Sequence, residues 1–394
     1  MRVLYIDVNC KNSSTGNIVY SLYSQCISKN IDAAVCYGRG KRIKENNIYK
    51  FGLDFETYLH AFLTRITGYT GCFSFLSTLR LIKYIKRFKP DIVHIHELHA
   101  YFVNISKLLK FLKTRNIKTI FTNHCEFIYT GKCGHAKECT KYSSTCGSCP
   151  HLRDYPSSLW FDKTSKMLKS KKQLFENWNN CLIVSPSCWL NSRMSRSFLK
   201  EKNRVVVHNG IDTSIFIVSK KQISTSDKKV ILSVAPNIMS DLKGGKYVLE
   251  LSKLFKASDV EFLLVGDTTN YSGVIPDNVK IYPLITDRKQ LIELYQKANV
   301  FLICSSFENY PTTCLEAQCC GLPVFGFDVG GVSETILPGN GSVVGFADLN
   351  SLKEKIEKSL KEPIDKSIIS HRSIIEFSNE KMFENYLEIY KTFV

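Results

Sequence analysis

The sequence lacks any apolar run long enough to cross a membrane. Its most apolar strand-like segments, such as Val300–Cys304, are far shorter than the roughly 20 residues that a spanning helix needs. The first residues, Met1-Arg-Val-Leu-Tyr-Ile-Asp, have neither the apolar region nor the cleavage site of a signal peptide and predict a first strand instead. We therefore expect a cytoplasmic protein that is not anchored by a helix.

Low-complexity tracts are also missing. The 394 residues are 44% apolar and 23% charged, which is ordinary for globular proteins, and the length predicts two domains. The 15 cysteines come without an export signal and predict a reducing compartment, in which thiols stay free or bind metal.

Acidic residues are scarce in the first half only. Residues 1–208 contain 33 Lys and Arg but 13 Asp and Glu, whereas residues 209–394 contain 20 and 23. A basic N-terminal half predicts an anionic partner, which can be a membrane surface, a phosphate-bearing substrate or a nucleic acid.

Apolar runs alternate with helical patterns along the whole chain, which predicts an α/β fold with parallel sheets. The expected strands are Val3–Val8, Ile31–Tyr37, Asp91–His96, Lys118–Thr122, Leu182–Ser185 and Val205–Val207, then Val230–Val234, Glu261–Val265, Val279–Ile281, Val300–Cys304, Val324–Phe327 and Ser342–Phe346. A polar segment, Asp212–Lys229, reads as the linker between two such units. We expect domains at 1–208 and 209–372, with their ligand in a cleft between them.

Two glutamates, Glu308 and Glu316, flank the predicted start of a helix. Pro311 suits the first turn of that helix, and the N–H groups near Thr312 and Thr313 are orphan donors that can bind an anion. A carboxylate on each side matches the hydroxyl groups of a sugar and a ribose. The alternative is an ordinary helix start between two solvated glutamates.

This stretch resembles the E-x7-E motif of the retaining family 4 glycosyltransferases, which have the GT-B fold of two Rossmann-like domains facing a cleft. Other segments resemble further motifs of the family in the same order. They are Asp91-Ile-Val-His-Ile-His, Thr122-Asn-His124, Ser185-Pro-Ser187, Asn209-Gly-Ile-Asp212, Lys243-Gly244 and Asp328-Val-Gly-Gly-Val-Ser-Glu334. The resemblance covers nearly the whole chain and implies that a C-terminal helix, within 373–394, packs back on the N-terminal domain.

The resemblance also implies roles for the donor-site residues. Glu308 would hold hydroxyl groups of the donor sugar, and Glu316 would hold the ribose. Lys243, with Gly244 and the amides around Thr312 and Thr313, would stabilise the departing diphosphate. His124 would reach the sugar from the N-terminal domain, and Gly16 would lie in the loop nearest the diphosphate. A fixed cation and oriented amides favour the charge that develops as the diphosphate leaves. No cofactor and no protein base are implied.

One position departs from the family pattern. The family usually has an arginine at the end of the strand before Lys-Gly, where this chain has Asn237. Either another cation such as Lys246 substitutes for the arginine, or the diphosphate is held less tightly. The chain also has no Asp-x-Asp motif, so the metal–diphosphate chelate of the other main transferase fold is not expected.

Four cysteines fall within 17 residues of an insert at 131–156. Cys133, Cys139, Cys146 and Cys149 predict a structural zinc site, since four thiolates leave no open position for catalysis. Free thiols or a disulfide are the alternatives, and His135 or His151 could replace one thiol.

Three histidines, His94, His96 and His99, cluster at the end of one predicted strand. Alternation places His94 and His96 on the same side of the strand. We expect one buried histidine rather than a metal cluster, with His96 or His99 available to an acceptor.

The segment from Phe51 to Lys89 mixes aromatic residues with Lys83, Lys86 and Arg87. Either it contains a buried helix with a solvated basic side, or it docks on an anionic membrane.

The Cys-rich insert with its following Cys149-Pro-His-Leu-Arg-Asp-Tyr-Pro most resembles bacterial transferases of O-antigen or colanic-acid-type polysaccharide. The resemblance implies transfer of a hexose from a UDP- or GDP-sugar to a polyprenyl-diphosphate-linked oligosaccharide, at the inner face of the bacterial inner membrane. A nucleotide-sugar epimerase or hydrolase of the same fold is one rival. A four-cysteine zinc protein that binds nucleic acid is another, but it leaves Glu308, Glu316 and Gly330-Gly331 without a purpose.

Overall fold

The computed structural model describes residues 1–11, 13–218, 228–269 and 271–393. The chain folds into two compact units: one comprises Met1–His208 with Met382–Val394, and the other comprises Asn209–Lys381. Within the predicted linker, residues 219–227 lie outside the described residues. Among the described helices, none has the length and apolar content that a membrane crossing requires.

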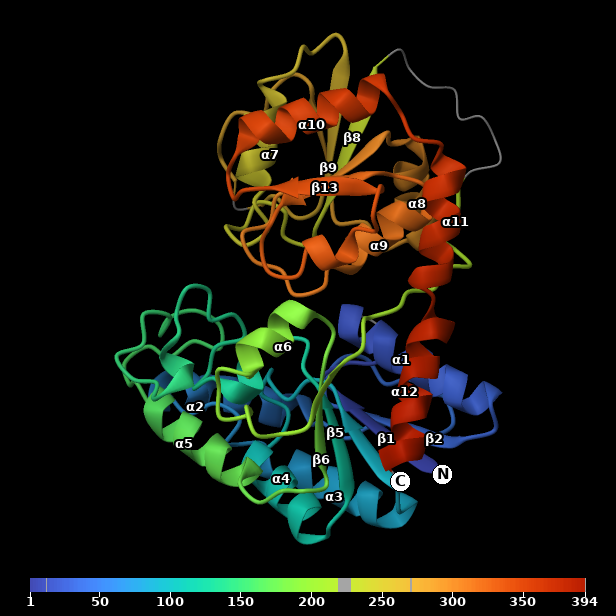
Figure 1. Ribbon diagram of the computed structural model, residues 1–394. Coiled ribbons are helices and arrows are strands. Elements are labelled where there is room, and N and C mark those ends of the chain that lie inside the picture. Colours follow the sequence, from blue (N-terminus) through green and yellow to red (C-terminus); the bar gives the residue numbers. More distant parts are fainter. Residues whose placement is uncertain (12, 219–227, 270, 394) are drawn as a thin grey trace. The chain divides into compact units, whose positions relative to one another are not determined.

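The first unit is built on a seven-stranded parallel sheet, in the order β3-β2-β1-β4-β5-β6-β7 (Figure 1). Its elements are β1 (Arg2–Asp7), α1 (Ser14–Ser28), β2 (Asp32–Tyr37), β3 (Ile48–Lys50), α2 (Asp54–Thr67), α3 (Phe75–Phe88), β4 (Ile92–Ile95), α4 (Ile105–Thr114), β5 (Lys118–Thr122), η1 (Phe127–Tyr129), η2 (Lys141–Ser143), α5 (Thr164–Phe175), β6 (Cys181–Ser185), α6 (Cys188–Met194), β7 (Arg204–Val206) and α12 (Asn379–Phe393).

The second unit repeats this plan with six parallel strands, in the order β10-β9-β8-β11-β12-β13. Its elements are β8 (Lys229–Val234), α7 (Gly245–Ser252), β9 (Val260–Val265), β10 (Val279–Tyr282), α8 (Arg288–Lys297), β11 (Val300–Ile303), α9 (Thr312–Cys319), β12 (Val324–Phe327), η3 (Ser333–Thr335), β13 (Gly341–Val344), α10 (Leu349–Lys361) and α11 (Lys366–Glu376).

Each sheet is covered on both faces, as parallel sheets generally are. Side chains of β1 alternate between two hydrophobic clusters: Leu4 and Ile6 join one, and Val3 and Tyr5 join the other. The second sheet is likewise packed between two clusters. The prediction of two doubly wound α/β units is confirmed.

Helix α12 belongs to the first unit, as the sequence predicts for the C-terminal helix. Its apolar face packs in the cluster around β1 and α1, and Figure 1 shows it beside these elements. The Tyr386 hydroxyl lies 2.8 Å from Thr122 Oγ1, and the Tyr390 hydroxyl lies 2.7 Å from His94 Nδ1. These contacts tie the helix to the middle of the sheet.

The last domain boundary falls later in the structure than the sequence patterns place it. Residues 373–381 group with the second unit, because α11 packs on α9. Ser370 Oγ donates to the Cys319 carbonyl at 2.6 Å, and Asn340 donates to Ser373 Oγ at 3.2 Å. Polar contacts of this kind leave no signature in hydrophobic periodicity.

Candidate active site

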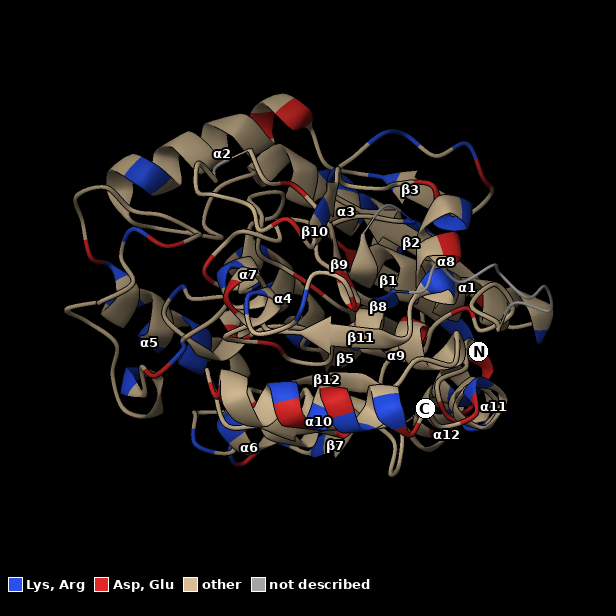
Figure 2. Cartoon of the chain, turned by 90° about the horizontal axis from the view of Figure 1, so that it is seen from above, with Lys and Arg blue, Asp and Glu red and all other residues tan. Residues whose placement is uncertain are grey.

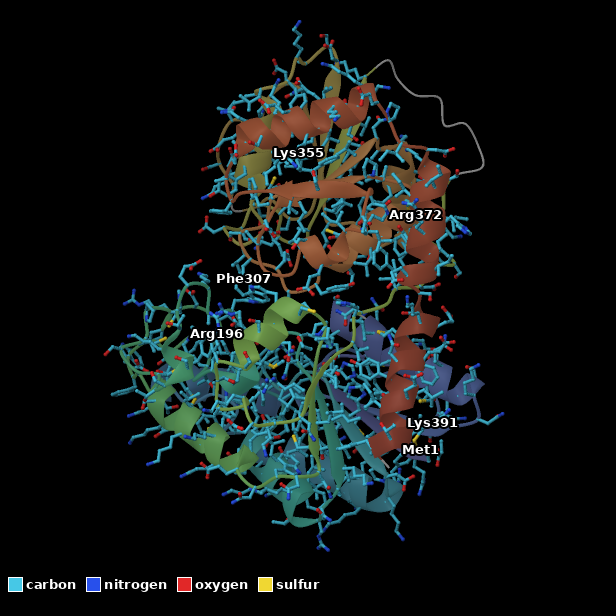
Figure 3. The ribbon with its side chains drawn as sticks, in the orientation of Figure 1. Met1, Arg196, Phe307, Lys355, Arg372 and Lys391 are labelled. Carbon is cyan, nitrogen blue, oxygen red and sulfur yellow. The ribbon has the colours of Figure 1, made fainter. Side chains whose placement is uncertain are left out.

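In the second sheet, the order in which successive strands are added reverses between β8 and β11. The chain runs from β8 outward through β9 and β10, then returns to pair β11 beside β8. Loops at the carboxyl ends of two such neighbouring strands diverge and leave room for a ligand. The Lys243 and Glu308 segments are the loops that follow these two strands, and Phe307, labelled in Figure 3, lies in the second of them.

Backbone contacts hold these two loops together. Ser306 N donates to the Leu242 carbonyl and Ser306 Oγ to the Asp241 carbonyl, both at 2.9 Å. Gly244 has φ +68, and a Cβ there would lie 1.9 Å from the Cys304 carbonyl oxygen. Only glycine permits this approach, so the Lys-Gly pair brings Lys243 to the end of β11.

Lys243 and Glu308 form an ion pair, with Nζ 2.5 Å from Oε1. Ser305 Oγ donates to the same oxygen at 2.8 Å. The Lys243 side chain is 31% exposed and that of Glu308 is 13% exposed. Both contacts engage the same carboxylate oxygen, Oε1.

The glycine pair Gly330-Gly331 supports the backbone of Glu308. Gly331 N donates to the Glu308 carbonyl at 3.2 Å. Gly330 has φ +60, and a Cβ there would lie 1.7 Å from the same carbonyl oxygen. The Asp-Val-Gly-Gly loop therefore fixes the position of the Glu308 backbone.

Glu316 lies inside α9 and points toward α8. Its Oε2 accepts a hydrogen bond from the buried Tyr295 hydroxyl at 2.9 Å. Burial raises the pKa of Glu316 to about 7, while the Tyr295 hydrogen bond and the Arg288 charge act in the opposite direction. A hydrogen bond donated to this carboxyl group favours its ionised form.

The start of α9 differs slightly from the sequence expectation. Pro311 occupies the position before the helix, with φ −68 and ψ 115, and Thr312 is the first helical residue. The N–H groups of Thr312 and Thr313 therefore have no carbonyl one turn earlier, as at any helix start. They lie in the segment between the two glutamates, as the motif requires.

Asn237, which stands where the family has arginine, lies in the exposed turn after β8. Its carbonyl accepts from Ser240 N at 3.1 Å and from Ser240 Oγ at 2.8 Å, which shapes the turn leading to Lys243. Lys246 is 51% exposed, and its Nζ lies 3.7 Å from Asp241 Oδ1. A half-exposed lysine is thus present in the first turn of α7, just after this loop.

In the first unit, Gly16 lies in the first turn of α1. Its N–H donates to the Ser13 side chain at 2.9 Å, which caps the helix. A Cβ at this position would lie 2.9 Å from Ser13 Oγ and 3.2 Å from the Asn9 backbone. The loop from β1 to α1 is therefore closed tightly over this glycine.

Near β4 and β5, the rings of His94 and His96 lie 4.3 Å apart, and those of His96 and His124 lie 5.3 Å apart. His94 is fully buried between Tyr390 and Thr122. His96 Nδ1 lies 3.0 Å from His124 Nε2 and is itself buried. Burial lowers the pKa of His124 to about 4, so this half-buried imidazole is neutral at pH 7. His99 lies against Glu97, with Nε2 3.2 Å from Oε2.

Two buried carboxyl groups in the first unit were not expected. Asp7 ends β1 and Glu97 follows β4, the neighbouring strands at which this sheet also reverses. Glu97 accepts from His124 N at 3.1 Å, and Asp7 accepts from Glu97 N at 3.2 Å. Burial raises the pKa of Asp7 to about 7 and that of Glu97 to about 8. An acidic residue at the end of each central strand was the signal available in the sequence.

Potential metal ligands occur in two places. The donor atoms of Glu97, His99 and Cys125 all lie within 4.8 Å of one another. The four cysteines of the insert, at 133, 139, 146 and 149, all line one small cavity. Lys243, Glu308 and Glu316 are in neither group.

Two models of glycosyltransferase families together match residues 16–378. Residues 16–215 match the model of Glycosyltransferase Family 4, and residues 216–378 match that of Glycosyl transferases group 1. A protein of Escherichia coli K12 described as a colanic acid biosynthesis glycosyl transferase, WcaC, is 22% identical over 99% of this chain and 100% of its own length.

Solved structures share the fold over its full length. Sucrose-phosphate synthase from Thermosynechococcus elongatus superposes with a TM-score of 0.70 at 15% identity, covering 99% of this chain and 98% of that one. The Anabaena protein HepE, solved in complex with UDP, superposes with a TM-score of 0.63 at 14% identity over all of both chains. The chain is a GT-B glycosyltransferase and belongs to glycosyltransferase family 4.

Proposed function

We propose that this protein is a retaining hexosyltransferase of bacterial surface polysaccharide synthesis, such as O-antigen, lipopolysaccharide or capsule. It takes a hexose from a UDP- or GDP-sugar and passes it to a polyprenyl-diphosphate-linked oligosaccharide. The observation that carries the proposal is the Lys243–Glu308 pair, 2.5 Å apart beside the start of α9. The full-length similarity to the colanic acid relative supports the substrate class.

In the proposed reaction, the acceptor oxygen attacks the anomeric carbon from the face that the diphosphate leaves. The carbon–phosphate oxygen bond breaks, and the departing phosphate takes the proton of the acceptor hydroxyl. Lys243 and the N–H groups of Thr312 and Thr313 stabilise the negative charge that grows on the diphosphate. No metal ion and no protein base take part in this scheme.

The remaining residues position the donor. Glu308 accepts hydrogen bonds from hydroxyl groups of the sugar, and Glu316 accepts them from the ribose. His124, held in a neutral form by burial, contacts the sugar, and Gly16 gives the diphosphate room at the start of α1. Lys246 supplies the cation that Asn237 cannot provide.

We propose that the enzyme works at the cytoplasmic face of the inner membrane and docks there through α2. The polarity of this helix is the reverse of the usual one, because its buried residues are polar and its exposed ones include apolar side chains. The buried residues are Glu56, Thr57, His60 and Thr64. Its outward residues are apolar and each at least half exposed: Phe55, Tyr58, Leu59 and Phe62. In Figure 2 the ribbon of α2 is mostly tan between an acidic first turn and one basic position.

Two of the buried polar residues of α2 bind the segment that leads into α3. Glu56 accepts from Leu76 N and Ser77 N, both at 2.7 Å, at the start of α3. His60 accepts from Gly71 N at 3.1 Å. The helix thus cannot turn its apolar side inward without losing these bonds.

More apolar side chains and cations lie on neighbouring segments. Phe75, Leu76 and Leu79 of α3 are about half exposed. Lys107 lies 5.7 Å from the centre of the Phe75 ring, and Lys163 lies 5.3 Å from that of exposed Phe161. Aromatic residues flanked by lysines suit the interface of an anionic bilayer.

Removing the apolar side of α2 should weaken membrane binding. The combined variant Phe55→Ser, Tyr58→Ser and Phe62→Ser should sediment with phosphatidylglycerol vesicles at least about 10-fold less strongly, since each exposed aromatic contributes apolar burial. A matched control, Val274→Ser, Ile368→Ser and Ile375→Ser, changes three exposed apolar residues of the second unit. Equal loss in both variants would count against docking through α2.

The proposed reaction is tested with the intact protein, UDP- and GDP-hexoses and bacterial lipid extract. We expect hexose to enter the lipid fraction with the anomeric configuration of the donor, as read by proton NMR of the released glycan. Donor turnover that is equally fast without acceptor would indicate a hydrolase or epimerase. A product of inverted configuration would contradict the retaining mechanism.

A further inference from the structure

The insert at 131–156 plays no part in the proposed chemistry. From Thr130 to Lys163 the chain forms one 3-10 turn, η2, and otherwise only turns and bends. Loops of this length without secondary structure are uncommon in compact domains. Within the insert, Ala136 and Tyr142 reach the hydrophobic core of the unit. Cys133 and Cys146 pack against the same core, so two members of the cysteine-rich segment lie at the anchored side of the loop.

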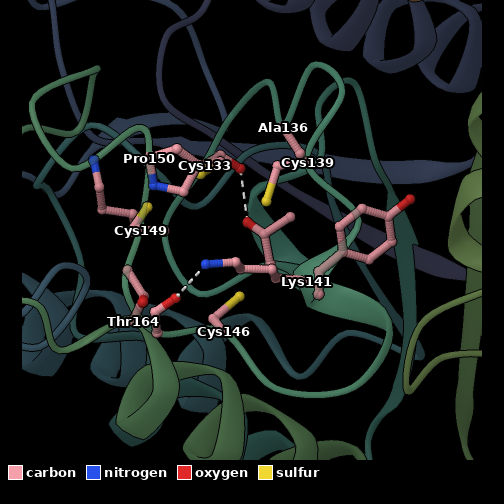
Figure 4. Close-up of a pocket in the computed structure, with 12 residues that line it drawn as sticks. Cys133, Ala136, Cys139, Lys141, Cys146, Cys149, Pro150 and Thr164 are labelled. Atoms are coloured by element: carbon pink, nitrogen blue, oxygen red, sulfur yellow. Dashed lines mark hydrogen bonds between the residues drawn. The ribbon is translucent and has the colours of Figure 1, made fainter.

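Four thiol groups converge within this loop. We call them the cysteine quartet: Cys133, Cys139, Cys146 and Cys149. All four line one cavity of about 20 Å³ (Figure 4), which holds little more than a single water-sized sphere. None of them forms a disulfide, and all are partly buried. The four side chains thus converge on one small cavity.

Backbone amides already point at two of these sulfur atoms. The N–H of His151 is hydrogen-bonded to Cys149, and the N–H of Gly131 is hydrogen-bonded to Cys146. The thiols of Cys133 and Cys149 interact directly with each other.

Two buried lysines lie around the quartet. Lys132 Nζ donates to the carbonyls of Asp154 at 2.7 Å and Pro156 at 2.6 Å. Lys171 Nζ donates to the carbonyls of Phe127 at 2.5 Å and Thr130 at 3.0 Å. Within the described residues, no carboxylate oxygen lies within 4 Å of either ammonium group.

The charges of these lysines need compensation, because an unpaired buried charge is costly. Lys132 lines the cavity of the quartet, and Lys171 donates to the carbonyl of Thr130, which lines the same cavity. A zinc ion bound by four thiolates carries a net charge of −2. Two ammonium groups would neutralise it.

We propose that the cysteine quartet binds one structural zinc ion, and that Lys132 and Lys171 balance its charge. Binding releases four thiol protons and involves no redox step. Zinc requires sulfur atoms at about 2.3 Å in a tetrahedron. The quartet is spaced more widely than this: among the described residues, only Glu97, His99 and Cys125 form a group of three with all donor atoms within 4.8 Å. The loop therefore closes around the ion.

The quartet can close around an ion without disturbing the sheet. The quartet lies on segments outside helices and strands, so small backbone rotations move the sulfur atoms without breaking a sheet. The C-terminal end of the loop is fixed near α5, where Asp162 accepts from Cys149 N at 2.7 Å and from Thr164 Oγ1 at 2.6 Å. Metal binding then completes a link between this helix and the start of the insert.

The first test uses the full chain purified in the presence of zinc and without chelator. We expect about one zinc per chain by mass spectrometry of the metal. Cobalt exchanged into the same protein should show the sulfur-to-metal charge-transfer band of a tetrahedral thiolate site. Zinc should fall to near zero in the double variant Cys133→Ser, Cys149→Ser. The control Cys188→Ser changes an exposed cysteine outside the quartet and should keep the metal.

The second test examines the lysines. Lys132→Met and Lys171→Met should each lower zinc affinity by about 10- to 100-fold in competition with a chelator, the size found for residues that support metal ligands. Lys169→Met, on the exposed side of α5, should leave affinity unchanged. Unchanged affinity in both buried-lysine variants would overturn their assigned role.

Several results would overturn the zinc site itself. One is a cobalt spectrum without sulfur charge transfer in the unaltered protein, which does not depend on whether a variant folds. Another is full zinc content in the quartet variant. A third is an intact mass, measured without reductant on freshly prepared cytosolic protein, that shows a disulfide within the quartet. None of these readouts involves sugar transfer, so they leave the proposed function untouched.

Discussion

Replacing Lys243 with methionine should lower kcat for sugar transfer by about 10²- to 10³-fold, with the protein still folded. Loss of one preorganised charge at the site of transition-state charge has effects of this size. Because Lys243 is 31% exposed, its removal leaves no cavity in the core. Turnover should be measured at saturating donor, so that weaker binding does not account for the loss.

Two controls make this result specific. Lys253→Met alters an exposed lysine at the end of α7 and should retain normal turnover. Glu308→Gln should also lower kcat strongly, and the double variant should be little worse than either single one, because Nζ and Oε1 act as one unit at 2.5 Å. Near-normal turnover in Lys243→Met would refute the assignment of the donor site.

Adding a single methyl group at Gly330 should abolish transfer almost as completely. The added Cβ of Gly330→Ala would lie 1.7 Å from the Glu308 carbonyl oxygen, so the loop bearing Glu308 must move. A shift of about 1 Å in a catalytic group costs about 10²-fold in rate. The φ of +60 adds roughly 1–2 kcal/mol of strain for alanine, so the melting temperature should fall as well.

The matched control is Gly345→Ala, at an exposed glycine whose added Cβ would meet nothing within 4 Å. It should keep both activity and melting temperature. To separate the two effects at Gly330, turnover is measured well below the melting transition of the variant. Full activity there would show that the position of the Glu308 backbone is unimportant.

The strands and the motif loops could be predicted from the sequence with good accuracy. Strand β12 (Val324–Phe327) was expected at its observed bounds, and β11 (Val300–Ile303) was expected one residue longer. Buried parallel strands read as continuous apolar runs, so their positions are visible without any tertiary information. The short strand β3 (Ile48–Lys50) was missed, because three residues carry no pattern.

The partners of the site residues were less predictable. Tyr295 lies 21 positions before Glu316, and Glu97 lies 27 positions before His124. Such pairs depend on which strands become neighbours, and periodicity does not encode this. Ser305 is close in sequence to Glu308, but a serine at a strand end is too common to single out.

The orientation of α2 could not be predicted from the sequence either. Its pattern indicates an amphipathic helix but not which side faces inward. The usual rule buries the apolar side. Here the polar side is buried, since Glu56 and His60 find donors in the segment from Gly71 to Ser77. Only the fold reveals that these donors are within reach.

The position of α12 bears on the order in which the chain matures during synthesis. Tyr386 and Tyr390 complete the centre of the first sheet by meeting Thr122 and His94. The ribosome delivers these tyrosines after the entire second unit has emerged. Until that stretch is made, the earlier-made half lacks the tyrosine partners of Thr122 and His94, which then have only each other. The later-made half is contiguous, and nothing in its sequence is missing when its last helix appears.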